Sequence, residues 1–174
     1  MIFNIIGGSG SGKTTLKFAL TKTGKFRGIV PCTTRPMRRD EVDGLHYHFV
    51  SWEIFAKQEF IISRIANGSN YGVRKEDLLC VDDSRIVVTT FDVDGIISLL
   101  RMGIDVRVLF LNINYQEREK RMLLRGDDKN EIAERLQFNS ERLTSASLGC
   151  SVLTVREATV AEHIRAVKNF IGID

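Results

Sequence analysis

Residues 7–14 read Gly-Gly-Ser-Gly-Ser-Gly-Lys-Thr, and they directly follow the apolar run Met1–Ile6. This stretch fits the pattern G-x-x-x-x-G-K-[ST], and Lys13–Lys22 behind it is predicted to be a helix. An apolar run that stops at a glycine cluster is typical of a buried parallel strand that ends in a tight turn. In a different context the same residues would be a flexible Gly-Ser turn. Between a strand and a helix they predict a phosphate-binding loop, because the glycines let backbone N–H groups point at phosphate oxygens beside the positive helix end.

Two side chains of this loop have specific chemical roles in the prediction. Lys13 is expected to bridge the β- and γ-phosphates of ATP, and the Thr14 hydroxyl is the candidate ligand of Mg²⁺. ATP is therefore the expected donor substrate and Mg²⁺ the expected metal. The predicted ATP-binding residues are Gly8, Ser9, Gly10, Ser11, Gly12, Lys13, Thr14 and Thr15.

Further along the chain, apolar β-rich runs alternate with helical patterns. The predicted strands are Ile29–Val30, Ile86–Phe91, Val106–Leu111 and Val152–Val155. The predicted helices are Asp92–Met102, Tyr115–Leu124, Glu131–Leu143 and Ala158–Ile171. Parallel strands need crossover connections, so this alternation predicts an α/β fold with a central parallel sheet covered on both faces. With the phosphate loop, it indicates the three-layer fold of P-loop NTPases.

Length and pattern also suggest how the chain is organised. At 174 residues and 43% hydrophobic, it is the right size for one compact domain. Short strand patterns such as Tyr47–Val50 and Phe60–Ala66 predict a small β-rich insertion. The charged, Gly-containing break from residue 125 to 135 is a candidate mobile lid. We therefore expect a core of residues 1–31, 75–120 and 145–174, an acceptor-binding insertion at 32–74 and a helical lid at 121–144.

Composition narrows the partners and the compartment. The net charge of +3, from 25 Lys and Arg against 22 Asp and Glu, is too small to indicate nucleic-acid or membrane binding. The three cysteines, Cys32, Cys80 and Cys150, form no C-x-x-C pair, which favours a reducing cytosol. No stretch approaches the roughly 20 apolar residues of a membrane span. A cytoplasmic protein, monomeric or homodimeric, is expected.

The stretch Thr33–Ser51 resembles the acceptor-binding stretch of guanylate kinases. Asn70-Tyr71-Gly72, the strand ending at Asp92 and the spacing of Arg121, Arg125 and Arg135 match further elements of that family. The resemblance extends from residue 2 to about residue 145 and is specific.

This resemblance implies roles for five residues on the acceptor side. Arg35, Arg38, Tyr47 and Tyr71 would bind the phosphate of an incoming monophosphate, and Asp92 would help to hold its base. Two guanidinium groups and two phenols can surround a dianion with charge-assisted hydrogen bonds. The alternatives are a solvated basic loop for the arginines and half-buried strand positions for the tyrosines. Asp92 could instead cap a helix or organise Mg²⁺ through water.

The resemblance also implies that Arg121, Arg125 and Arg135 close over the triphosphate and act with Lys13 in catalysis. Phosphoryl transfer spreads charge over three oxygens in a loose transition state, which positioned cations stabilise. Arg118 and Lys120 are interpreted instead as parts of a solvated helix face.

The base-reading positions depart from the family pattern. Guanylate kinases are expected to carry a serine and a glutamate where this chain has Pro31 and Ile62. The leading hypothesis is an ATP-dependent kinase of nucleoside or deoxynucleoside monophosphates, with GMP or dGMP by resemblance and a base preference that is altered or relaxed. One alternative is a sugar phosphate kinase of the ribose 1,5-bisphosphate type. The other is a non-catalytic protein-binding module, although such modules typically have a degraded phosphate loop.

Overall fold

The computed structural model of the chain describes residues 1–39, 41–66, 68–78, 84–136, 148–156 and 158–173. The strands are β1 (Ile2–Ile6), β2 (Phe26–Gly28), β3 (Cys32–Thr33), β4 (His48–Phe49), β5 (Phe60–Ala66), β6 (Ser69–Arg74), β7 (Ile86–Thr89), β8 (Val106–Leu111) and β9 (Ser151–Val155). The helices are α1 (Lys13–Lys22), α2 (Trp52–Phe55), α3 (Lys75–Leu78), α4 (Val93–Arg101), α5 (Tyr115–Leu124), α6 (Lys129–Leu136) and α8 (Val160–Ile171).

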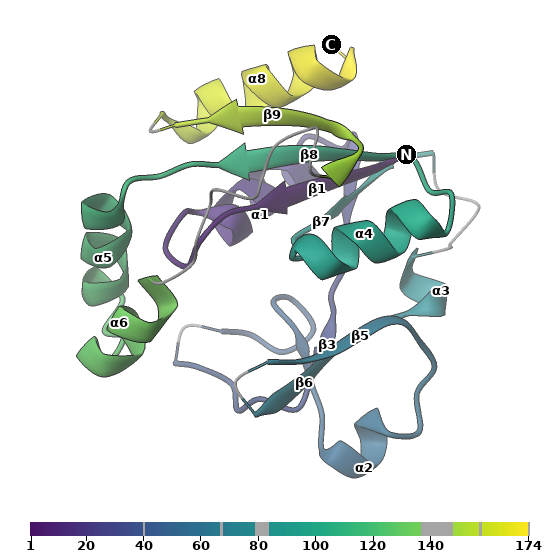
Figure 1. The fold of residues 1–174 in the computed structure, drawn as a ribbon, viewed down its shortest axis with the longest axis vertical. Helices are drawn as coiled ribbons and strands as arrows, with labels where there is room; N and C mark the ends of the chain where they lie inside the picture. Colours follow the sequence, from purple (N-terminus) through teal and green to yellow (C-terminus); the bar gives the residue numbers. More distant parts are fainter. Residues whose placement is uncertain (40, 67, 79–83, 137–147, 157, 174) are drawn as a thin grey trace.

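The larger sheet has five strands in the order β2-β7-β1-β8-β9, and every pair in it is parallel. Alternate residues of the central strand β1 serve opposite faces, as the pleat requires. Phe3 and Ile5 join a core cluster with residues of α1 and α8, whereas Ile2 and Ile6 join one that includes α4. The sheet is therefore covered by helices on both faces (Figure 1). The predicted α/β three-layer architecture is confirmed.

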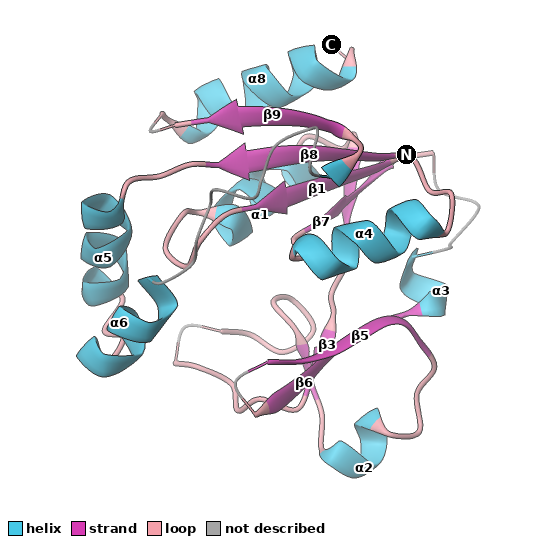
Figure 2. Cartoon of the chain, viewed as in Figure 1, coloured by secondary structure: helices cyan, strands magenta, loops and turns pink. Residues whose placement is uncertain are grey.

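The smaller sheet has four strands in the order β4-β3-β6-β5 and lies apart from the larger one, below α4 in Figure 2. Its β5–β6 hairpin is antiparallel, with Arg64 opposite Tyr71 in the register. On α2 and β5, Phe55 and Phe60 stack with ring centres 4.2 Å apart. This sheet falls within the segment that was predicted to be a β-rich insertion.

Helices α5 and α6 lie together beside the loop that follows β1 (Figure 1). Met122 of α5 packs against Ile132 and Leu136 of α6 in a small core of their own. Helix α6 falls within the segment 121–144 that was predicted to be the lid, and α5 overlaps this segment only from Arg121 onward.

Several element bounds differ from the sequence predictions. Ile29–Val30 is not a strand, because the edge strand β2 ends at Gly28. Helix α4 begins at Val93 because the side chain of Asp92 accepts a hydrogen bond from the Gly95 backbone and caps the helix. Helix α6 begins at Lys129, and the predicted helical residues 137–143 lie outside the described part of the chain.

Candidate nucleotide and acceptor sites

The loop between β1 and α1 has the backbone that a phosphate-binding loop requires. Gly10 and Gly12 have φ angles of 77° and 95°, in the left-handed region that glycine adopts readily. A Cβ atom at Gly8 would lie 2.2 Å from the Arg118 guanidinium, and one at Gly10 would lie 2.6 Å from the Arg118 carbonyl oxygen. The glycines therefore serve both the curvature of the loop and its close approach to α5.

Polar groups of this loop favour an anion. The Lys13 ammonium donates to the carbonyl oxygens of Gly7 and Gly8, at 2.8 and 2.9 Å. Burial, with the charges of Arg118 and Arg125, lowers the pKa of Lys13 to about 8. The Ser11 hydroxyl is buried and has no hydrogen-bond partner among the described residues. A phosphate group in the loop would stabilise the Lys13 cation and can accept a hydrogen bond from Ser11.

Thr14 and Thr15 lie in the first turn of α1 and are exposed to solvent. A hydroxyl oxygen is a suitable ligand for Mg²⁺, which keeps several waters and is usually held by one or two protein groups together with substrate phosphates. No group of three or more His, Cys, Asp or Glu side chains in the described ranges can hold a metal ion by itself. Thr14 beside the phosphate loop therefore fits a magnesium ion that arrives with ATP.

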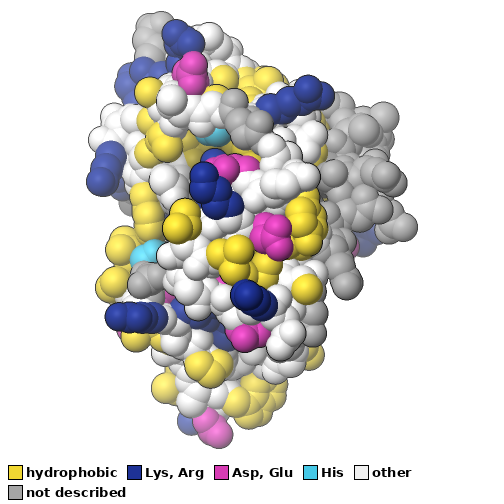
Figure 3. All heavy atoms as spheres, turned by 90° about the vertical axis from the view of Figure 1, so that its left-hand side faces the viewer, with side chains coloured by type: hydrophobic (Ala, Val, Ile, Leu, Met, Phe, Trp, Pro, Cys, Tyr) yellow, Lys and Arg dark blue, Asp and Glu magenta, His cyan; other side chains and the backbone are white. Residues whose placement is uncertain are grey.

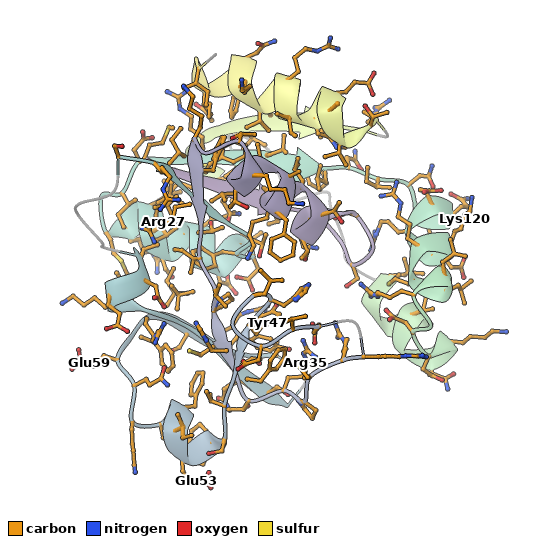
Figure 4. All side chains as sticks on the ribbon, turned by 180° about the vertical axis from the view of Figure 1, so that it is seen from behind. Arg27, Arg35, Tyr47, Glu53, Glu59 and Lys120 are labelled. Carbon is orange, nitrogen blue, oxygen red and sulfur yellow. The ribbon has the colours of Figure 1, made fainter. Side chains whose placement is uncertain are left out.

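The prediction that Arg118 lies on a solvated helix face is wrong. It is only 7% exposed, and its Nε donates to the carbonyl oxygen of Ser9 at 2.9 Å. Burial lowers its pKa, although it stays cationic. The sequence contained one usable signal, since Arg118 and Arg121 are three residues apart and thus share a helix face. Lys120 is exposed, as predicted, on the opposite side of α5 (Figure 4).

Two of the three predicted lid arginines lie near the phosphate loop. Arg121 forms an ion pair with Glu117 at 2.7 Å, and its Nη1 lies 3.5 Å from the carbonyl oxygens of both Gly10 and Ser11. Arg125 pairs with Asp127, and its charge contributes to the lowered pKa of Lys13. Arg135 is on α6, and its side chain lies outside the described part of the structure.

Three of the four predicted phosphate-binding residues on the acceptor side come together: Arg35 follows β3, Tyr47 precedes β4 and Tyr71 lies on β6. The rings of Tyr47 and Tyr71 have centres 5.9 Å apart, and the Arg35 guanidinium lies 5.5 Å from the Tyr47 ring centre (Figure 4). Burial raises the pKa of Tyr47, so this phenol is a hydrogen-bond donor at neutral pH. The cluster presents a cation and phenol groups to one small volume.

Glu41 belongs to this cluster and was not predicted. Its carboxylate pairs with Arg35 at 2.7 Å and accepts from the Arg38 backbone N–H at 2.8 Å. Burial alone would raise the pKa of Glu41, but these hydrogen bonds hold it below its usual value. The carboxylate thereby orients one predicted arginine and fixes the backbone of the other. In the sequence, the only indication of a role for Glu41 was an acidic residue close to the arginines of this stretch.

Between the two sheets lies an open cavity of about 540 Å³, solvent-facing space included. Its lining includes Tyr47 and Tyr71, the two departures Pro31 and Ile62, and the polar side chains Arg64, Thr90 and Asp92. The described structure thus places Pro31 and Ile62 on the walls of the cavity next to the predicted phosphate-binding residues.

Asp92 has two contacts in this cavity. Its Oδ1 accepts from the Gly95 backbone N–H at 3.1 Å, so the alternative role as a helix cap is confirmed. Its Oδ2 lies 2.6 Å from Nη1 of Arg64, a residue that the sequence did not single out. Because side chains alternate along a strand, Ile62 and Arg64 share one face of β5. That spacing was the available signal for Arg64.

Two features bear on possible membrane or nucleic-acid partners: the length and hydropathy of the described helices, and the distribution of charge on the face in Figure 3. Among the described helices, none is both long enough and apolar enough to cross a bilayer. On that face, Lys and Arg side chains are spread among acidic, apolar and uncharged ones.

Comparison with known proteins gives a consistent set of similarities. The family model described as guanylate kinase matches residues 2–172. A guanylate kinase of Helicobacter pylori (strain ATCC 700392 / 26695) is 35% identical over 148 residues, which cover 79% of this chain and 72% of that protein. Guanylate kinase 1 of Arabidopsis thaliana is 29% identical, over 98% of this chain and 46% of its own length. The crystal structure of guanylate kinase from Anaplasma phagocytophilum matches 99% of this chain and 84% of its own, with a TM-score of 0.63 and 17% identity, which shows a shared fold.

Proposed function

Because this chain belongs to the guanylate kinase family and is an ATP-dependent nucleoside monophosphate kinase, we propose that it transfers the γ-phosphoryl group of ATP to GMP or dGMP. The observation that carries the proposal is the presence of two cationic sites in one domain. One is the loop around Lys13, and the other is the cluster of Arg35 with Tyr47 and Tyr71.

In the proposed reaction the loop holds the phosphates of ATP. Backbone N–H groups and Lys13 bind the β- and γ-phosphates, and Thr14 holds the magnesium ion. When bound, magnesium neutralises charge that develops on the transferring group. The lowered pKa of Lys13, about 8, is compatible with this role because the phosphates favour the charged ammonium.

The acceptor phosphate is assigned to Arg35, Arg38, Tyr47 and Tyr71 within the acceptor-binding segment 32–74. Charge-assisted and phenol hydrogen bonds would orient its oxygen toward the γ-phosphorus, and positioning supplies much of the catalysis in this chemistry. Glu41 orients Arg35 in this scheme, because its carboxylate pairs with that guanidinium.

Arg121 and Arg125 are assigned to the transferring group, within the proposed lid 121–144. Arg121 already lies near the carbonyl oxygens of Gly10 and Ser11, and the charge of Arg125 acts on Lys13. Cations there would stabilise the charge spread over three phosphoryl oxygens. Arg135 is proposed as a third member from the family resemblance.

A relaxed or altered base preference is the second candidate, and Pro31 and Ile62 favour it. Both line the cavity, and neither side chain can form a hydrogen bond to a base. Sites that read a substrate by hydrogen bonds can discriminate by about 10⁴-fold or more, whereas apolar contacts discriminate far less.

A coupled ADP-release assay tests the proposal. The acceptors are GMP, dGMP, AMP, CMP, UMP and ribose 1,5-bisphosphate, each with Mg-ATP, and the Lys13→Ala variant is the inactive control. We expect turnover with GMP or dGMP that depends on magnesium and is lost in the variant. Turnover with the sugar bisphosphate alone would refute the nucleotide acceptor. No ADP release with any acceptor would favour the protein-binding module.

A further inference from the structure

We propose that Arg64 is a base-reading residue, which donates two hydrogen bonds to O6 and N7 of the acceptor guanine. The inference rests on the proposed function and identifies how this chain recognises a purine despite Pro31 and Ile62.

The walls of the cavity offer few ways to read a base. Pro31 has no hydrogen-bonding side chain, and Ile62 is purely apolar. Two threonine hydroxyls also line the cavity: that of Thr89 donates to Asn4 at 2.6 Å, and that of Thr90 offers a single uncharged hydrogen-bonding group. Among the described residues that line the cavity, Arg64 is the one cation and Asp92 is the one carboxylate. A base in this cavity therefore meets its charged partners at the Arg64–Asp92 pair.

The Arg64 guanidinium is held in one place by two contacts. Its Nη1 lies 2.6 Å from Oδ2 of Asp92, and its central carbon lies 5.4 Å from the centre of the Tyr71 ring. Asp92 is itself fixed by its bond to the Gly95 backbone N–H. Within the described residues, the Nε and Nη2 groups of Arg64 have no hydrogen-bond partner. These two groups form the parallel donor edge of a guanidinium.

The chemistry of this edge selects a particular base. Arginine is a donor only, and its two parallel N–H groups match two neighbouring acceptors. Guanine presents O6 and N7 side by side, which is the pairing that arginine makes most often with a base. Adenine presents N7 beside an amino donor, so one of the two contacts would be repulsive. Arg64 therefore favours a 6-carbonyl purine by contacting its O6 and N7 atoms. A glutamate at position 62 would instead accept hydrogen bonds from the N1 and N2 groups of guanine.

We expect the protein to keep its fold when Arg64 is replaced. Its side chain is 47% exposed and that of Asp92 is 29% exposed, and a partly exposed ion pair contributes little stability. The change Arg64→Met keeps an unbranched apolar chain of similar reach over Tyr71. Arg101→Met is the matched control, because Arg101 is exposed in the last turn of α4, away from the cavity lining.

The experiment measures kcat/KM for GMP, 7-deaza-GMP and AMP with the wild type, Arg64→Met, Arg64→Lys and Arg101→Met. In 7-deaza-GMP a C–H group replaces N7, so one acceptor is lost. We expect the wild type to prefer GMP over both analogues. Arg64→Met should lower kcat/KM for GMP by about 5- to 150-fold, the range for one bidentate arginine–base pair. Arg64→Lys should keep part of the preference for GMP, since an ammonium can also donate to O6 and N7 but lacks the fixed parallel N–H pair of a guanidinium. The KM for ATP should not change.

Three results would overturn the proposal. The first is equal use of GMP and 7-deaza-GMP by the wild type. The second is an equal loss for all three acceptors in Arg64→Met, which would place Arg64 at the phosphate or in the fold. The third is a GMP rate in Arg64→Met that equals that of Arg101→Met. A wild type that uses no monophosphate at all would instead refute the proposed function on which this role rests.

Discussion

The side chain of Asn4 ties the central strand to the acceptor cavity, and its removal should affect stability and acceptor binding together. Asn4 is fully buried on β1. Its Oδ1 accepts from the Thr89 hydroxyl at 2.6 Å and the Phe91 N–H at 2.7 Å, and its Nδ2 donates to the Phe91 carbonyl at 3.1 Å. Phe91 and the next residue, Asp92, line the cavity. One amide thus positions the end of β7 where the base is expected to bind.

For Asn4→Ala we expect a loss of about 3 kcal/mol in the free energy of unfolding, since each of the three hydrogen bonds contributes about 1 kcal/mol. The loss is smaller than the total stability of a typical domain, about 5–15 kcal/mol, so the variant should still fold. Released from Asn4, Phe91 and Asp92 become less well positioned. The KM for the acceptor should therefore rise several-fold, while the KM for ATP changes little.

Urea denaturation followed by circular dichroism measures the first effect, and steady-state kinetics with each substrate varied measures the second. Asn112→Ala is the control, because Asn112 is exposed. A loss of stability no larger than that of the control would show that the Asn4 bonds are not stabilising. An unchanged acceptor KM, with the expected loss of stability, would refute the link from Asn4 to the cavity.

Three further predictions concern single cationic side chains. Lys17 is 5% exposed with its Nζ donating to the Ile29 carbonyl at 2.9 Å, and burial lowers its pKa from 10.5 to about 8. The unfolded chain binds this proton more tightly than the folded chain, so protonated Lys17 lowers the free energy of unfolding by its full amount below pH 8 and by less as the pH rises towards 10.5. In urea titrations, the free energy of unfolding should therefore rise by about 2 kcal/mol between pH 7 and 9.5, relative to Lys17→Met. Equal pH dependence in both proteins would contradict the assigned burial. Arg38→Ala should raise the acceptor KM far more than the ATP KM in steady-state assays, and a larger effect on ATP would remove Arg38 from the acceptor site. Arg118→Met should weaken ATP binding about tenfold in calorimetry, because one charge-assisted bond to the Ser9 carbonyl is lost from the phosphate loop; unaltered affinity would make Arg118 a packing residue only.

The local parts of the fold followed from the sequence. The glycine-rich loop, helix α1 and strand β8 have the predicted bounds because each depends on neighbouring residues: a glycine at a positive φ, a helical period or a continuous apolar run. The short edge strand β2 did not follow in the same way. Its pairing with β7 begins at Phe26, and the apolar pair Ile29–Val30, which resembles a strand, comes after its end.

The sequence by itself also determined the chemical class, since the phosphate loop with Lys13 and the basic stretch with Arg35 are local motifs. Only the tertiary structure decided which side chains meet. Arg118 is buried because α5 packs on the phosphate loop, and Arg64 reaches Asp92 because the smaller sheet lies opposite the start of α4. Sequence periodicity assigns a residue to a face of its own strand or helix. Which residue a side chain contacts on another element depends on how the elements pack together. The contacts of Arg118 with Ser9 and of Arg64 with Asp92 are of this kind, so the sequence did not predict them.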